Sequence, residues 1–315
     1  MCERVQQEVN LMNSTENKSA VITGASSGIG RACVSRIIGS EWRVFATIRK
    51  PADGERLRSE FGSRLTPVKM DVTDRNSITA AAQQVAAEVG SAGLDGLVNV
   101  AGIGMVRPVE FVSDADLQEI FDINVFGQLA VTRAFLPLLR QARGRIVNIS
   151  SVGAHIAVPF GSMINASKSA FGMFSDTLRL ELHPFGIHVS VVEPGAIKTP
   201  AVEKTLGNID AVIANLPPNG AALYGPMIKK FAARGYAREM NGSSPDVVAR
   251  AVHHALTARQ PRLRYRAGKH AKFLTTLPIL SDRMLTALLL RIAGMPTGFG
   301  AIASPNTTEK QPRAA

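Results

Sequence analysis

The stretch that decides the fold is Thr23-Gly24-Ala25-Ser26-Ser27-Gly28-Ile29-Gly30. It follows a short β-branched run at 19–23 and precedes an amphipathic run at 29–38, so it predicts a turn that joins a strand to a helix. Glycines there allow a tight turn and let a pyrophosphate approach the backbone, and the N–H groups of the helix offer a positive dipole end. Because three glycines after a strand can also form an ordinary turn, the nucleotide-binding interpretation depends on the surrounding pattern.

That pattern alternates short apolar runs with longer amphipathic ones. The short runs are β-branched and lack clean alternation, which is typical of strands buried on both faces. Strands are predicted at 19–23, 43–47, 65–70, 96–99, 144–149 and 188–192, and helices at 29–38, 78–89, 116–139 and 164–183. This order predicts an α/β fold with a Rossmann-type doubly wound parallel sheet.

The same pattern predicts one dinucleotide-binding domain over 18–295, with a disordered lead-in at 1–17 and a flexible tail at 296–315. Prolines and short helical pieces over about 196–245 are typical of a helical lid above a substrate site. A basic helical extension follows, with an amphipathic run at 270–293.

Composition narrows the class of protein. The chain is 45% hydrophobic, as a globular core requires, and its two cysteines are too few for a disulfide framework. No apolar signal-like run stands near the N-terminus, so we expect a cytoplasmic protein. The six histidines and two cysteines show no metal-ligand spacing, and we predict no metal site.

The net charge of +11 is concentrated in the C-terminal part. Residues 225–315 carry 15 lysines and arginines against 4 acids, a difference that accounts for the whole net charge. Since no basic motif with interleaved aromatic residues is present, nucleic acid is not expected as a partner. A solvated basic face and peripheral contact with an anionic membrane surface both stay open. The uninterrupted apolar stretches of 270–293 are too short to span a bilayer.

Further motifs follow the glycine-rich stretch in a fixed order. They are Asp71-Val72, Asn99-Val100-Ala101-Gly102, Asn124, Ser151, Lys168, and Pro194-Gly195 with Thr199. Over about 19–200 the chain resembles the short-chain dehydrogenase/reductase family, which writes these motifs as TGxxxGxG, an acid near the adenine, NNAG, a catalytic tetrad and PGxxxT. Val100 replaces the second asparagine of NNAG. The stretch at 261–278, PRLRYRAGKHAKFLTTLP, resembles the retinol and hydroxysteroid dehydrogenase branch.

The resemblance implies roles for these residues. Ser151 would hold a substrate carbonyl, Asn124 a relay water, and Lys168 the nicotinamide ribose. The implied cofactor-binding residues are Gly24, Ser26, Ser27, Gly28, Ile29, Gly30, Arg49, Asp71, Val72, Asn99, Ala101, Gly102, Lys168, Pro194, Gly195, Ile197 and Thr199. A homo-oligomer paired through the helices near 116–139 and 164–183 is also implied.

The end of the second predicted strand favours NADP over NAD. NAD-preferring members of the family carry an acid there for the ribose 2′-hydroxyl, whereas this chain carries Arg49 and Lys50. A guanidinium matches a 2′-phosphate in charge and in its paired donors.

The catalytic tyrosine position of the family holds Ile164, four residues before Lys168. Isoleucine has no ionisable proton. His155, Tyr224, Ser151 or water remain as candidate donors; histidine titrates in the right range, whereas an unactivated hydroxyl is a poor acid. Ile164 would otherwise be an apolar residue in a pocket wall.

Four interpretations of this sequence stay open. We favour an NADP(H)-dependent oxidoreductase for an apolar steroid-, retinoid- or polyketide-like carbonyl or alcohol, because Asn124, Ser151 and Lys168 remain in register. The alternatives are a non-redox cyclase or isomerase on the same scaffold, a catalytically silent NADP(H)-binding protein, and an active enzyme altered by mutation or design. Phenylalanine is the usual choice for a designed knockout, so isoleucine disfavours design.

Overall fold

The computed structural model describes residues 18–300, so the predicted lead-in at 1–17 and residues 301–315 of the predicted tail lie outside the described part. A seven-stranded sheet with the order β3-β2-β1-β4-β5-β6-β7 forms its centre, and every strand pair is parallel. The strands are β1 (Ser19–Ile22), β2 (Arg43–Ile48), β3 (Leu65–Lys69), β4 (Gly96–Asn99), β5 (Arg145–Ile149), β6 (His188–Pro194) and β7 (Arg264–Ala267). The doubly wound parallel fold is confirmed, and six of these strands match the predicted ones to within two residues.

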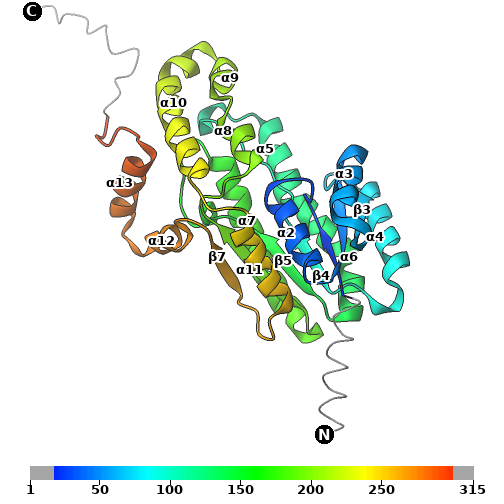
Figure 1. Ribbon diagram of the computed structural model, residues 1–315. Coiled ribbons are helices and arrows are strands. Elements are labelled where there is room, and N and C mark those ends of the chain that lie inside the picture. The colour runs from blue at the N-terminus through cyan, green and yellow to red at the C-terminus, as the bar shows by residue number, and fades with distance from the viewer. Residues whose placement is uncertain (1–17, 301–315) are drawn as a thin grey trace, which may run out of the picture.

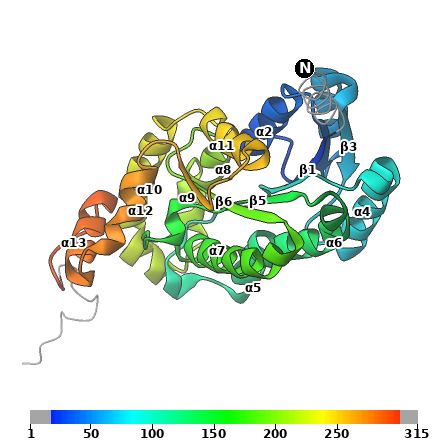
Figure 2. The ribbon, with the colours of Figure 1, turned by 90° about the horizontal axis from the view of Figure 1, so that it is seen from below.

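Helices cover both faces of the sheet, as Figure 2 shows. One face packs against α2 (Gly28–Ile38), α3 (Pro51–Phe61) and α11 (Asp246–Thr257). The other packs against α4 (Arg75–Val89), α6 (Gln128–Ala142) and α7 (Ser162–Leu182). Because side chains of one strand point alternately to the two faces, Ile22 enters the first core and Val21 the second. The central strands β1 and β4 are therefore buried along their whole length, as the sequence pattern indicated, whereas β7 at the edge is polar.

The order of the strands reverses between β1 and β4, and ligands bind parallel sheets at such a switch point, beyond the carboxyl ends of the strands. Ile22 of β1 pairs with Ala46 of β2 on one side and with Val98 of β4 on the other. Just beyond, the Thr23 hydroxyl accepts hydrogen bonds from the backbone N–H groups of Val100 at 2.8 Å and Ala101 at 3.0 Å. This contact fixes the two chain segments that leave the sheet at the switch point.

The single helix predicted over 116–139 is wrong in one respect. α5 (Asp114–Phe121) begins at a capping box formed by Ser113 and Asp116, and a π-helical turn (Asp122–Gly127) separates it from α6. At Gly127 an added Cβ would lie 2.7 Å from the carbonyl oxygens of Asp122 and Val72, so a side chain there has no space. The turn places Asn124 in the interior, fully buried. Such π-helical turns are frequent at functional sites.

A buried chain of polar side chains ties the sheet to its helices. The Asn99 amide donates to Thr132 Oγ1 at 3.0 Å and to Asn148 Oδ1 at 2.9 Å. Asn148 in turn donates to Ser175 Oγ at 2.8 Å. These contacts link β4 and β5 to α6 and α7 behind the carboxyl edge, where the catalytic candidates lie.

The predicted lid at 196–245 forms three helices, α8 (Pro200–Leu206), α9 (Ile209–Ala214) and α10 (Pro218–Met240). They pack on an apolar cluster that includes Val106, Phe160 and Phe231. The predicted run at 270–293 is interrupted at Pro278, so it forms α12 (Ala271–Thr276), a 3-10 turn (Leu277–Ile279) and α13 (Asp282–Ala293). In Figure 1 these last helices lie at one end of the molecule, beside α10. None of the helices between residues 18 and 300 is long and apolar enough to cross a membrane.

Candidate active site

The glycine-rich turn lies between β1 and α2 and has the geometry of a phosphate cradle. Gly24 and Gly28 adopt positive φ angles of 62° and 52°, which side-chain-bearing residues rarely take. A Cβ at Gly30 would lie 2.1 Å from the Gly24 carbonyl oxygen, so the helix can start this close to the turn only with glycine. The N-terminus of α2 has no side-chain cap at Ser27 and no acid in its first turn. Its free N–H groups therefore fit the diphosphate of a dinucleotide.

The loop after β6 meets this turn. A Cβ at Gly28 would lie 3.4 Å from Thr199 Cβ, so the predicted nicotinamide-end segment at 194–199 runs beside the phosphate cradle. Gly102 lies in the same region: a Cβ there would be 3.1 Å from Asn124 Oδ1 and 3.5 Å from Lys168 Nζ. Residues from the ends of β1, β4 and β6 thus meet at one edge. Ile197 is buried in the core instead, and its backbone N–H donates to Glu239 Oε2 at 3.2 Å, so both its side chain and its N–H are engaged within the protein.

The predicted adenine end is built at the ends of β2 and β3. The Asp71 carboxylate accepts hydrogen bonds from the Thr73 backbone at 2.9 Å and from the Thr73 hydroxyl at 2.8 Å. Partial burial raises the pKa of Asp71, but the Thr73 hydrogen bonds and the nearby charge of Arg49 outweigh it and leave that pKa below its ordinary value. Arg49 is exposed at this end. Arg56, which the sequence did not single out, donates to the Ser26 carbonyl at 2.8 Å.

The side chain of Asn99 does not face this edge. It is buried in the polar chain with Thr132 and Asn148, so a cofactor contact at this position falls to the backbone of residues 99–102. Val72 is likewise a buried core residue behind Asp71.

Lys168 lies in the second turn of α7 and points toward the end of β5. Its Nζ donates to the Ile149 carbonyl oxygen at 2.9 Å. The lysine is buried, and this burial lowers the pKa of its ammonium group to about 8. No ion pair to Lys168 is formed within residues 18–300. The site thus holds a desolvated cation whose partner in the fold is a neutral carbonyl.

Asn124 uses its whole amide within the protein. Its Oδ1 accepts from the Ile103 N–H at 2.9 Å, and its Nδ2 donates to the Ile103 carbonyl and the Ser167 hydroxyl, each at 3.0 Å. These bonds join the π-helical turn to the loop after β4 and to α7. A relay water, the role predicted for Asn124, would have to compete with them for the side chain.

Ser151 follows β5 and begins a 3-10 turn (Val152–Ala154). Its Oγ accepts from the Gly153 N–H at 3.0 Å, and no acceptor for its own hydroxyl hydrogen occurs among the residues that the structure describes. That hydrogen is available to a substrate oxygen. The serine comes directly after Ser150, whose hydroxyl donates to the Lys168 carbonyl at 3.2 Å, so the serine loop and α7 are joined.

Ile164 is partly exposed in the first turn of α7, one turn before Lys168. A Cβ at Gly104 would lie 3.3 Å from Ile164 Cδ1 and 3.2 Å from Thr205 Oγ1. The isoleucine therefore faces the loop after β4 and the lid helix α8. It forms an apolar wall at the position where the sequence motif predicts a phenol.

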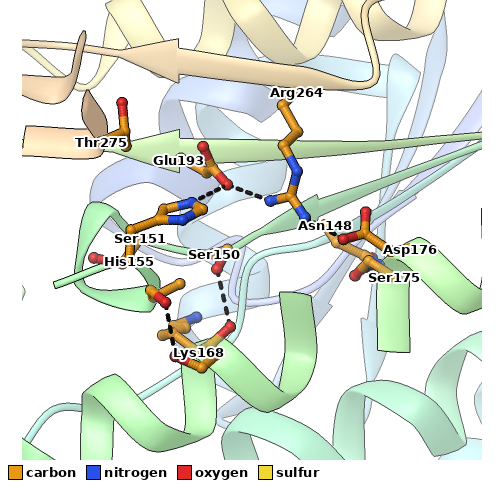
Figure 3. A network of polar contacts seen from close by, with 12 residues as sticks. Asn148, Ser150, Ser151, His155, Lys168, Ser175, Asp176, Glu193, Arg264 and Thr275 are labelled. Atoms are coloured by element: carbon orange, nitrogen blue, oxygen red, sulfur yellow. Dashed lines mark hydrogen bonds and ion pairs between the residues drawn. The ribbon is translucent and has the colours of Figure 1, made fainter. Parts of the chain in front are cut away.

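The two other predicted proton donors are engaged elsewhere. His155 Nε2 lies 2.8 Å from Glu193 Oε1, and Figure 3 shows the fully buried Glu193 between His155 and Arg264. The Tyr224 hydroxyl donates to Glu110 Oε2 at 2.9 Å. This hydrogen bond, with smaller contributions from burial and the Glu110 charge, raises the pKa of Tyr224.

The acid cluster around Glu193 was not predicted. Arg264 of β7 pairs with both Glu193 and Asp176, and these two charges outweigh the effect of burial to raise the pKa of its guanidinium. The sequence signal was an acid at the end of an apolar strand, opposite an arginine in a stretch that looked like basic surface. The cluster joins the C-terminal extension to the sheet edge behind Ser151.

No group of three or more histidine, cysteine, aspartate or glutamate side chains suited to a metal ion occurs between residues 18 and 300.

Comparisons with known proteins show the family to which this chain belongs. The model of the short chain dehydrogenase family matches residues 18–210. Retinol dehydrogenase 5 of Homo sapiens is 40% identical over 287 residues, covering 87% of this chain and 89% of that protein. This chain belongs to the short-chain dehydrogenase family. Like its relatives of the retinol and hydroxysteroid branch, it is an oxidoreductase of the class that acts on CH–OH and C=O groups.

Other members of the family extend the likeness. The 17-beta-hydroxysteroid dehydrogenase type 6 of Rattus norvegicus is 35% identical over 296 residues, with 91% of this chain and 92% of that protein covered. A short-chain dehydrogenase from Streptomyces avermitilis superposes with a TM-score of 0.70 at 30% identity, covering 88% of this chain and 97% of the other. One from Burkholderia cenocepacia, solved with NADP, gives 0.66 at 26% identity over 88% and 98% of the two chains. The predicted family and its branch are thus confirmed.

Proposed function

We propose that this protein is an NADP(H)-dependent oxidoreductase that acts on the carbonyl or alcohol of an apolar, steroid-, retinoid- or polyketide-like substrate. The observation that carries the proposal is the meeting of Ser151, Lys168 and Asn124 beside the glycine-rich turn at one edge of the sheet. The names of the relatives, retinol and hydroxysteroid dehydrogenases, support the substrate class.

Each part of the edge suits one part of the dinucleotide. When bound, the nicotinamide would supply or accept the hydride. The turn at 24–30 would hold the diphosphate, Lys168 the nicotinamide ribose, and the loop at 194–199 the nicotinamide end. Arg49, exposed and near Asp71, would pair with the 2′-phosphate of NADP, as its charge and fork of donors allow. The NADP bound to the Burkholderia cenocepacia relative supports this choice.

The substrate side is apolar and contains the Ser151 hydroxyl, whose hydrogen has no acceptor among residues 18–300. Ile164, the cluster with Val106 and Phe160, and the ring of Tyr224 near Phe160 offer contacts to a lipophilic molecule. Ser151 would donate its hydroxyl hydrogen to the carbonyl oxygen and stabilise the charge that develops there. Because the Tyr224 hydroxyl and one ring nitrogen of His155 are bound to carboxylates and Ile164 has no proton, we favour water or a group beside Ser151 as the donor.

The C-terminal helices support peripheral membrane contact. Phe273, Ile279 and Met284 expose 53%, 90% and 59% of their surface, and only Ala293 of α13 is buried. Lys272, Arg283 and Arg291 lie on α12 and α13, and Ile279 lies in the 3-10 turn between these helices. Apolar side chains flanked by cations suit an anionic lipid surface.

Homo-oligomerisation through the long helices stays a prediction. It is supported by Phe126, Met173 and Leu180, which expose large apolar surfaces on the π-helical turn and α7. Analytical ultracentrifugation tests it, and a monomer at micromolar concentration would contradict it.

The cofactor proposal predicts the effect of Arg49→Ala. Loss of a charged contact to the 2′-phosphate should weaken NADPH binding by about ten- to a hundredfold, since hydrogen bonds to charged groups contribute roughly 1.5–3 kcal/mol. Binding of NADH should hardly change. Titration calorimetry with both nucleotides measures this, with Arg58→Ala on exposed α3 as the control. Tighter binding of NADH than NADPH by the wild type would refute the preference.

The reductase proposal predicts a gain of activity in Ile164→Tyr. A phenol at this position restores a proton donor one turn from Lys168, and general acid catalysis contributes about 10²- to 10⁴-fold. The measurement is NADPH consumption with a panel of lipophilic ketones, and Ile164→Phe controls for ring size without the proton. Absence of turnover by the wild type and by Ile164→Tyr alike would count against the proposal.

The membrane proposal predicts that Ile279→Glu combined with Met284→Glu reduces cosedimentation with vesicles of phosphatidylcholine and phosphatidylserine. Carboxylates on the apolar face oppose both insertion and anionic lipid. Val109→Glu, at an exposed apolar residue away from these helices, serves as the control. Equal binding of all three proteins would show that α12 and α13 do not make the contact.

A further inference from the structure

The most unusual group in the active site is a buried lysine that has lost its usual phenolic neighbour. Lys168 Nζ donates to the Ile149 carbonyl at 2.9 Å, two residues before Ser151, and it lies beside Gly102 and Asn124. One turn earlier, Ile164 leaves an apolar surface on the same face of α7. A proton carrier is therefore present at this edge, although it is not the carrier that the family uses.

We propose that Lys168 is the catalytic acid of this enzyme in ketone reduction, and the base in the reverse reaction, acting through a water molecule beside Ile164. This inference rests on the proposed function and names the proton donor that the function leaves open.

The charges around Lys168 leave its ammonium free to give up a proton. Carboxylates on the elements packed against α7 are paired with other groups or exposed: Glu193 with His155 and Arg264, Asp176 with Arg179 and Arg264, Asp116 with Arg107, Asp122 with Gln118, and Asp114 and Glu119 at the surface. Burial without an ion-pair partner disfavours the charged form. The resulting pKa of about 8 is in the range that general acid–base catalysis at neutral pH requires.

The proton balance is complete. The carbonyl carbon receives a hydride from a reduced nicotinamide dinucleotide, and the carbonyl oxygen receives a proton from water, which takes one from the Lys168 ammonium. A C–H and an O–H bond form, the C=O π bond is lost, and the lysine is left as a neutral amine. Solvent returns a proton to this amine before the next turnover.

The other side chains of the site have roles that are compatible with Lys168 as the acid. Ser151 donates to the same carbonyl oxygen, and Asn124 holds the loop at Ile103 and the Ser167 hydroxyl on α7, which sets the direction of the lysine. Ile164 keeps the surroundings of the ammonium apolar. A phenol there would take over the proton, and Lys168 would then only tune it.

The first test measures the titration of Lys168 without cofactor or substrate. Between the folded pKa of about 8 and the ordinary value of 10.5, the unfolded chain holds a proton that the folded chain has lost. Folding stability due to this group therefore rises with pH across that window. The unfolding temperature of the wild type should rise relative to Lys168→Met from pH 8 to 10.5. Lys69→Met, at an exposed lysine, should show no such change against the wild type.

The second test uses Lys168→Arg, which keeps the charge and the donors but holds its proton above pH 12. Ketone reduction at saturating NADPH should fall in the wild type as the pH rises through about 8. Lys168→Arg should lose about 10²-fold in kcat and show no such pH dependence. Its dissociation constant for NADPH should stay within about threefold of the wild type if the guanidinium, which keeps the charge and the N–H donors, still contacts the ribose. In the Ile164→Tyr background the same substitution should cost much less, since the phenol supplies the proton.

These measurements distinguish a failure of the role proposed for Lys168 from a failure of the proposed reductase function. Equal losses from Lys168→Arg in both backgrounds, matched by equal losses of NADPH affinity, would reduce Lys168 to a ribose-holding residue and overturn the inference. A lysine that titrates at its ordinary value also overturns it, while ketone turnover by the same protein would still uphold the proposed function. Turnover in Ile164→Tyr but none in the wild type would overturn the role of Lys168 alone, and absence of turnover in both proteins would overturn both proposals.

Discussion

The structure depends on the close approach of two strand ends at the point where the order of the sheet reverses. Thr23, just after β1, holds the backbone of Val100 and Ala101 after β4 through its hydroxyl. Gly24 permits this approach, because a Cβ there would lie 3.0 Å from Ala101 Cα, and Gly30 lets α2 begin close to the turn, because its Cβ would lie 2.1 Å from the Gly24 carbonyl oxygen. Because every strand pair in this sheet is parallel, the carboxyl ends of all the strands lie at this edge. The cradle, the serine loop and the lysine are therefore brought together by the sheet and not by any ligand.

The second constraint is electrostatic. Lys168 is buried without an ion-pair partner within the described residues, and burying a cation costs free energy unless its hydrogens are satisfied. The fold provides one acceptor, the Ile149 carbonyl, and leaves the remaining hydrogens for ligands. In a protein that bound nothing here, this arrangement would only reduce stability. With a ribose and a relay water it becomes both a binding and a proton-transfer group.

Much of this could be predicted from the sequence. The central strands were predictable because they are buried on both faces and therefore continuously apolar, and the motifs at their ends placed the cradle. β7 was missed because its sequence, RYRA, is polar: the charge of Arg264 is neutralised by Glu193 and Asp176, which come from distant segments. The π-helical turn was also missed, since the amphipathic pattern continues through it.

The site was predicted less fully than the fold. Side-chain identity indicated Ser151 and Lys168, but the engagement of His155 with Glu193 and of Tyr224 with Glu110 depends on contacts across long sequence separations. Likewise, the buried position of Asn99 follows from partners on other elements. The pKa of Lys168 depends on burial by the folded chain, which no local pattern reveals.

We infer that the nucleotide site is complete although the phenol is absent. Titration calorimetry of the wild type with NADPH tests it most directly, alongside Gly30→Val, whose Cβ would collide with the Gly24 carbonyl. We expect one NADPH bound per wild-type chain and loss of binding in a Gly30→Val protein that circular dichroism shows to be folded. A folded wild type that binds no NADPH would contradict it.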